Sequence, residues 1–119
     1  MAYDRDLAER IRDLLGERPD VTEMAMFGGL AFLVNGHMAV AASGQGGALV
    51  RVDPADADGL TARTAAEPME MHGRPMRGWL RVAPADLART RQLAAWVERG
   101  VSYASSLPPK QGRTRRGRA

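Results

Sequence analysis

The sequence predicts an α+β fold of two layers, in which helices cover one face of an antiparallel sheet. Two hairpin patterns and a third run of strand-forming residues supply the strands, and helix signals precede, separate and follow them. The strand patterns occupy residues 30–40, 48–52 and 68–82, and the helix patterns occupy residues 4–16, 53–60 and 83–105. In the order α-β-β-β-α-β-β-α, turns or single helices can join all neighbouring strands, which favours antiparallel pairing.

An apolar repeat predicts the first helix. Asp4 can accept hydrogen bonds from free backbone amides as the N-cap, and Gly16 ends the helix. The apolar positions recur at i, i+4, i+7 and i+8, which is the spacing of one helix face. They are Leu7, Ile11, Leu14 and Leu15.

Asn35-Gly36 predicts a two-residue hairpin turn, because a type I′ turn needs positive φ at both central residues. With that turn, Val34 lies opposite His37, and Phe32 lies opposite Ala39. One strand face then consists of Leu30, Phe32, Val34, Ala39 and Ala41, and the other consists of Ala31, Leu33, Met38 and Val40. Both faces are apolar, whereas a two-layer domain buries only one face of its sheet. We therefore expect the second face to contact another element or another subunit.

Similar signals predict the elements that follow. Asp53-Pro54 supplies an N-cap and a first helical residue for a helix to about Leu60. The second hairpin turns around His72-Gly73-Arg74, and Ala83-Pro84 begins the longest helix, which runs to about Ser105. The apolar stripe of that helix is expected to comprise Leu87, Leu93, Ala94, Trp96, Val97, Val101, Tyr103 and Ala104.

The positive charge of the chain is concentrated at its end. The net charge is +3, but five basic residues follow position 109 without an acidic one: Lys110, Arg113, Arg115, Arg116 and Arg118. Removing these five from the 17 basic residues leaves 12 against 14 acidic ones, a net charge of −2 for residues 1–109. We expect a domain at 1–107 and a basic, disordered tail at 108–119. The five cations could bind nucleic acid weakly, or the tail could serve only as a solubilising end.

Composition also restricts the chemistry. The chain has no cysteine, which excludes disulfides, thiol catalysis and Cys-ligated zinc and suits a cytoplasmic protein. The N-terminus does not resemble a signal peptide, and no apolar run approaches the ~20 residues of a membrane helix.

No catalytic, cofactor-binding or metal-binding residue is predicted. Gly28-Gly29 precedes a strand and lacks the spacing of a phosphate loop, so close packing of the first helix or a bulge explains it better. His37 and His72 are expected to be exposed in turns, without a metal-ligand spacing. No serine has a recognisable general base near it in sequence.

Two further groups leave alternatives open. Six methionines could fill core space or form an adaptable contact surface: Met24, Met26, Met38, Met69, Met71 and Met76. Arg74, Arg77 and Arg81 surround Trp79, a pattern that could support base stacking with phosphate contacts, or that could be a solvated strand face.

Two motifs carry a family resemblance. The first is Met26-Phe27-Gly28-Gly29 with the Asn35-Gly36 turn, and the second is Gly73-Arg74-Pro75-Met76-Arg77-Gly78-Trp79. On these motifs the chain resembles the N-terminal domain of the TfoX/Sxy family over residues 3–106. The resemblance implies a secretion-chaperone-like α-β(3)-α-β(2)-α architecture and a link to the regulation of natural competence. It implies no catalytic residues.

Three classes of function follow from these features. We expect a non-catalytic regulatory domain that acts by protein–protein contact, as a homodimer or with a protein partner. The alternative is a nucleic-acid-associated regulator that uses the basic tail. The third is a small-molecule binder or an enzyme with a pocket near Phe27-Gly28-Gly29.

Overall fold

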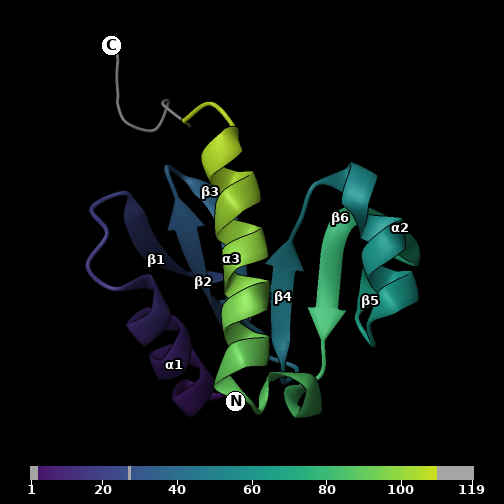
Figure 1. Cartoon of the computed structure of the whole chain (residues 1–119), viewed down its shortest axis with the longest axis horizontal. Coiled ribbons are helices and arrows are strands. Elements are labelled where there is room, and N and C mark those ends of the chain that lie inside the picture. Colours follow the sequence, from purple (N-terminus) through teal and green to yellow (C-terminus); the bar gives the residue numbers. More distant parts are fainter. Residues whose placement is uncertain (1–2, 27, 110–119) are drawn as a thin grey trace.

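A six-stranded antiparallel sheet forms one layer of the protein, and three α-helices lie along one of its faces (Figure 1). The computed structural model describes residues 3–26 and 28–109. The strands are β1 (Val21–Met26), β2 (Gly29–Val34), β3 (His37–Ala42), β4 (Ala48–Arg51), β5 (Glu67–Met71) and β6 (Arg74–Val82), in the spatial order β1-β2-β3-β4-β6-β5. The helices are α1 (Arg5–Leu15), α2 (Pro54–Arg63) and α3 (Thr90–Ser106), with a short 3-10 helix η1 (Pro84–Leu87). This arrangement confirms the predicted α+β fold.

Helix α1 forms as its cap predicts. Oδ1 of Asp4 accepts hydrogen bonds from the backbone N–H groups of Asp6 at 3.0 Å and Leu7 at 3.2 Å. The prediction that Leu14 belongs to the buried stripe is wrong, because Leu14 is 39% exposed. Ala8 is buried instead. Successive helical residues rotate by about 100°, so burial of Ala8 turns Leu14 to the edge of the buried face.

Strand β1 was not predicted. It pairs with β2 along its whole length, from Val21 opposite Val34 to Met26 opposite Gly29. Its four central residues are exposed on both faces, so its sequence shows no alternation of apolar and polar residues. The order is therefore α-β(4)-α-β(2)-α, with one strand more than the resemblance implied.

A β-bulge changes the register of the first hairpin. Val34 lies opposite His37 and Leu33 opposite Met38, as predicted, but Phe32 then lies opposite Val40 instead of Ala39. The extra residue in β3 shifts all residues beyond it by one position. The prediction that Val40 shares a face with Leu33 is therefore wrong: Ala39 and Val40 both belong to the core beneath the helices, and Ala41 takes the place of Val40.

The later elements largely follow the prediction. Asp53 Oδ1 accepts a hydrogen bond from Ala55 N at 2.9 Å and caps α2, which continues to Arg63. The second hairpin turns at His72-Gly73, where both residues have positive φ. The single long helix predicted for 83–105 is wrong, because Arg89 is extended and separates η1 from α3.

The main core lies between the helices and the sheet. Its largest fully buried side chains are Phe32, Ile11, Leu80, Leu87, Leu93, Val34, Val40, Val50 and Val82. Helix α3 crosses the middle of the sheet and buries Leu93, Trp96, Val97, Gly100 and Ala104, whereas Ala94, Val101 and Tyr103 of the predicted stripe are only half-buried. Of the helices that the structure describes, none has the length and apolar character needed to span a membrane.

Candidate functional site

The sheet face that no helix covers is apolar. Six buried side chains from β2, β3, β4 and β5 form a cluster on it, with Met26 and Trp79 packed against them; we call this surface the apolar face. The six are Ala31, Leu33, Met38, Ala41, Leu49 and Met69. Of the residues predicted to share a contact surface, Ala31, Leu33 and Met38 thus lie together, and Val40 lies on the opposite side of the sheet.

Neighbouring side chains shield the centre of the apolar face. Leu33 is 8% exposed and Met38 is 5% exposed, whereas Met24 of β1, on the same side of the sheet, is 51% exposed. Met24 pairs with Ala31 across β1 and β2, and paired residues point to the same face. The accessible apolar surface therefore lies along the β1 border of the face.

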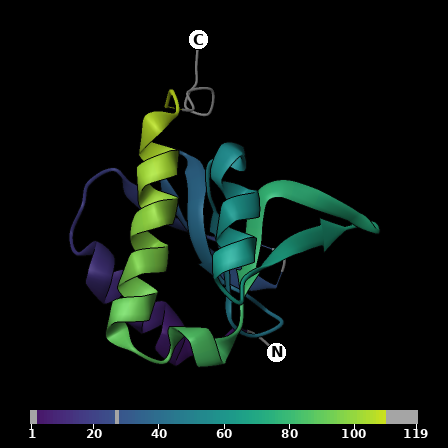
Figure 2. The same cartoon turned by 45° about the vertical axis from the view of Figure 1, so that its right-hand side comes forward.

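A cavity of about 310 Å³ opens on the apolar face. Methionines from three strands line it together with Leu49: Met26, Met38 and Met69. Its polar lining comes from Ser43, Gln45, Glu70, His72 and Arg81. His72 lies at the tip of the β5–β6 hairpin, which projects from the body of the protein (Figure 2). Three of the six methionines of the predicted adaptable surface thus line this cavity.

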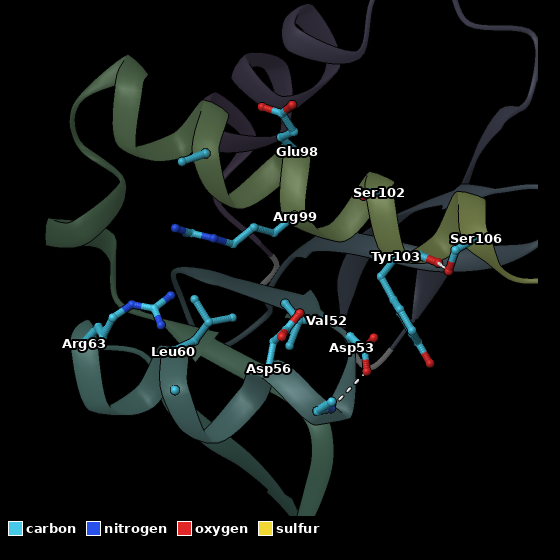
Figure 3. Close-up of a pocket in the computed structure, with 13 residues that line it drawn as sticks. Val52, Asp53, Asp56, Leu60, Arg63, Glu98, Arg99, Ser102, Tyr103 and Ser106 are labelled. Carbon is cyan, nitrogen blue, oxygen red and sulfur yellow. Dashed lines mark hydrogen bonds between the residues drawn. The ribbon is translucent and has the colours of Figure 1, made fainter.

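A wider groove of about 780 Å³ separates α2 from α3 (Figure 3). Val52 and Leu60 contribute apolar surface to it. Asp53, Asp56 and Arg63 contribute charge from the α2 side, and Glu98 and Arg99 contribute charge from α3. In Figure 3, Arg63 and Arg99 extend into the groove from its opposite sides. The guanidinium of Arg99 also lies 4.5 Å from the centre of the Trp96 ring.

The groove does not assemble a nucleophile and a base from the serines that line it. The hydroxyl of Ser106 donates to the carbonyl oxygen of Tyr103 at 2.6 Å, and Ser102 has no hydrogen-bonded base among residues 3–26 and 28–109. Ser43, which is buried outside the groove, accepts a hydrogen bond from Gln45 N at 3.1 Å and orders the β3–β4 loop. The hydroxyls of Ser106 and Ser43 thus form hydrogen bonds with the nearby backbone.

The two histidines lie in different environments. His72 is exposed at a hairpin turn, as predicted. His37 is half-buried, and its Nε2 lies 2.6 Å from the carbonyl oxygen of Pro108, so the expectation of an exposed turn histidine is wrong for His37. Within the described part of the chain, no three His, Cys, Asp or Glu side chains gather as a group that could hold a metal ion.

Trp79 forms a cation–π contact with Arg51 that was not predicted from the sequence. The guanidinium of Arg51 lies 5.1 Å from the Trp79 ring centre and 5.5 Å from that of Tyr103. Arg51 lies directly opposite Trp79 in the β4–β6 pair. That register is set by strands distant in sequence, so only a correct β4–β6 pairing could have indicated the contact. Of the arginines predicted to surround Trp79, Arg81 lines the cavity and Arg77 Nη2 lies 3.4 Å from the carbonyl oxygen of Pro54.

Two ion pairs on the surface shift pKa values. Arg12 Nε and Nη2 donate to the two carboxylate oxygens of Glu23, at 2.7 and 3.0 Å. These hydrogen bonds, with the charge of Arg12, lower the pKa of Glu23 and tie α1 to β1. A similar pair with Arg18 lowers the pKa of Asp20, mainly through hydrogen bonding.

The glycines of the two sequence motifs lie where backbones approach closely. A Cβ at Gly29 would overlap the carbonyl oxygen of Ala42, so this glycine permits contact with the end of β3 and not, as predicted, with the first helix. Gly78 has φ +83° and accepts a hydrogen bond from Val52 N at 2.8 Å, where β6 passes the start of α2.

A family model, that of the TfoX N-terminal domain, matches residues 13–104, which extend from α1 almost to the end of α3. The chain belongs to the TfoX N-terminal domain family. No curated protein and no solved structure shows significant similarity to it. In this TfoX N-terminal domain, the motif residues build turns and close backbone contacts. Phe27 of the first motif and the five basic residues after position 109 lie outside the described residues.

Proposed function

We propose that this TfoX N-terminal domain is a non-catalytic, cytoplasmic regulatory domain that acts by protein–protein contact, as a homodimer, in the setting of competence regulation that its family implies. The observation that carries the proposal is the apolar face. A soluble two-layer domain normally presents a polar outer sheet face, whereas four strands here contribute apolar side chains to that side.

The composition of the face suits a contact surface. Methionine side chains have three rotatable bonds and adapt to irregular partners, and Met26, Met38 and Met69 come together here. The exposed Met24 extends the apolar surface to the sheet border. A partner that covers Met24, Met26 and Trp79 would complete the burial of the apolar face.

A substitution at the centre of the apolar face tests this role. Leu33→Glu places a charge on the face, and Thr61→Glu on the helical side of the molecule is the matched control. We expect native-lysate capture of a protein partner to be lost for Leu33→Glu and retained for Thr61→Glu, with far-UV circular dichroism showing that both are folded. If Leu33→Glu does not fold, Trp79→Ala at the border of the face replaces it. Undiminished capture by a folded variant would contradict the proposal.

The alternative, a nucleic-acid-associated regulator, draws support from the charge distribution alone. Five cations follow position 109, whereas residues 1–109 carry a net charge of −2. Phosphate contacts would then come from the tail and not from the folded domain, and binding would weaken steeply with salt. Removal of the tail distinguishes this alternative from protein–protein contact.

A further inference from the structure

The two edges of the sheet differ in how they are protected against pairing. An edge strand exposes unpaired backbone N–H and C=O groups, and proteins commonly block such edges with proline, charged residues or a covering element. The β5 edge carries Pro68 between Glu67 and Met69, and a second carboxylate at Glu70. Proline cannot donate a hydrogen bond to an added strand, so this edge is blocked.

The β1 edge has no proline, and its one charged residue is tied to a helix. Its six residues, Val-Thr-Glu-Met-Ala-Met, include no proline and no basic residue, and the four central ones are exposed. Its one charged residue, Glu23, is held by two hydrogen bonds from Arg12 of α1 on the helical side of the sheet. Met24, the most exposed of the large apolar side chains described, lies at the centre of the strand. The backbone of β1 is therefore open to another strand.

Building on the homodimer of the proposed function, we infer that β1 pairs antiparallel with β1 of a second copy, and that the two sheets join into one. Symmetric antiparallel pairing of two identical strands requires a two-fold axis perpendicular to the sheet, so residues that point to the same face lie opposite each other. The helices of both copies then lie on one side, and the two apolar faces become a continuous surface on the other.

Charge and overlap select the register of this pairing. With Glu23 opposite its own counterpart, two carboxylates would face each other, which destabilises a strand pair. With Val21, Thr22, Ala25 or Met26 at the centre, no more than half of each six-residue strand would overlap. With Met24 at the centre, Thr22 lies opposite Met26 and Glu23 lies opposite Ala25 of the second copy. This register avoids the repulsion and brings the two exposed Met24 side chains together.

The absence of cysteine permits a direct test, because one substitution introduces a single thiol. Residues opposite each other in an antiparallel pair have Cα atoms about 4.5–5.5 Å apart, within the range that a disulfide spans. Met24→Cys should therefore form a covalent dimer under mild oxidation. Thr22→Cys is the matched control: it lies on the same strand and face, but its two copies would be four residues out of register, about 13 Å apart.

Non-reducing gels follow how fast the full chain of each variant forms a covalent dimer. The molar mass of the unmodified protein in solution is measured separately. Rapid cross-linking of Met24→Cys with slow or absent cross-linking of Thr22→Cys supports the β1 pairing. A dimeric mass with no cross-linking, or with equal rates for the two variants, overturns the β1 pairing and leaves the homodimer intact. A monomeric mass at every concentration overturns both.

Discussion

Gly100 of α3 lies against the carbonyl oxygen of Ala39, the extra residue in the bulge of β3. A Cβ at position 100 would overlap that oxygen, so α3 can rest on the bulged strand only because residue 100 has no side chain. Gly100→Ala should therefore lower the free energy of unfolding by about 1–3 kcal/mol, as overpacking of a rigid contact does. Urea denaturation followed by circular dichroism measures the change.

Gly59→Ala is the control for that substitution, because Gly59 also lies within a helix. A Cβ at position 59 would meet Nη1 of Arg63 at 3.2 Å, and this atom is the end of a flexible side chain that can move away. Replacing a glycine within a helix by alanine removes unfolded-state entropy, so we expect a gain of about 0.5–1 kcal/mol. Equal destabilisation by the two substitutions would show that the contact with Ala39 is not the cause.

The bulge also marks how far local sequence could predict this fold. The turns at Asn35-Gly36 and His72-Gly73 and the cap at Asp4 were predictable, because each depends on the chemistry of adjacent residues. The strand register beyond Leu33 could not be predicted from local sequence, because the bulge accommodates α3, about 60 residues further along the chain. Likewise β1 carries no alternating pattern, because it is an exposed edge.

The candidate site likewise combines features that local sequence predicts with features that depend on tertiary contacts. The sequence predicted an apolar second sheet face and correctly assigned Ala31, Leu33 and Met38 to it. It assigned Val40 wrongly, since one bulged residue exchanges the faces of all residues beyond it. The α2–α3 groove and the contact between Arg51 and Trp79 depend on tertiary contacts that no local pattern contains.

The rotation of α1 can be tested with two alanine substitutions. Ile11 is fully buried and Leu14 is 39% exposed, although both were predicted to lie on the core face. Ile11→Ala should lower the free energy of unfolding by about 2–5 kcal/mol, because it leaves a cavity under the helix. Leu14→Ala should cost less than about 1 kcal/mol, and chemical denaturation of both variants checks the difference. If both substitutions lowered the free energy of unfolding by similar amounts, Leu14 would lie in the core, which would contradict the observed orientation of α1.

The Arg12–Glu23 ion pair should make stability depend on pH on the acidic side. Its hydrogen bonds lower the pKa of Glu23 in the folded state, so folding favours the ionised carboxylate. The contribution is fully present above the unfolded-state pKa of about 4.3 and is lost as pH falls through the lower native value. We expect the Tm of Glu23→Gln to lie below that of the unmodified protein at pH 7 and to converge with it once the pH falls below the lowered native pKa of Glu23.

Glu17→Gln provides the control for the pH series. Glu17 is exposed and forms no salt bridge with any residue between positions 3 and 26 or 28 and 109. Its substitution should leave the Tm difference from the unmodified protein constant over the same pH range. A constant difference for Glu23→Gln as well would mean that the ion pair does not contribute to the acid dependence.

Deletion of residues 110–119 tests the nucleic-acid alternative. If the five cations of this segment contact phosphates, the unmodified protein should bind DNA or RNA at low salt, and the deletion should abolish binding. Fluorescence anisotropy with a labelled oligonucleotide, repeated at increasing salt, measures both effects. Unchanged binding after the deletion would eliminate the tail as the contact.

The central claim, that the domain functions through self-association and protein contact at its uncovered sheet side, is tested most directly by the molar mass of the unmodified chain in solution. Light scattering over a wide range of protein concentration should show the mass rising reversibly from that of one 12.9 kDa chain to that of two. Met24→Glu, which places a charge at the β1 border, should shift this rise to higher concentration, and Thr61→Glu on the helical side of the molecule should leave it unchanged. A mass that stays at 12.9 kDa at all concentrations would contradict the claim.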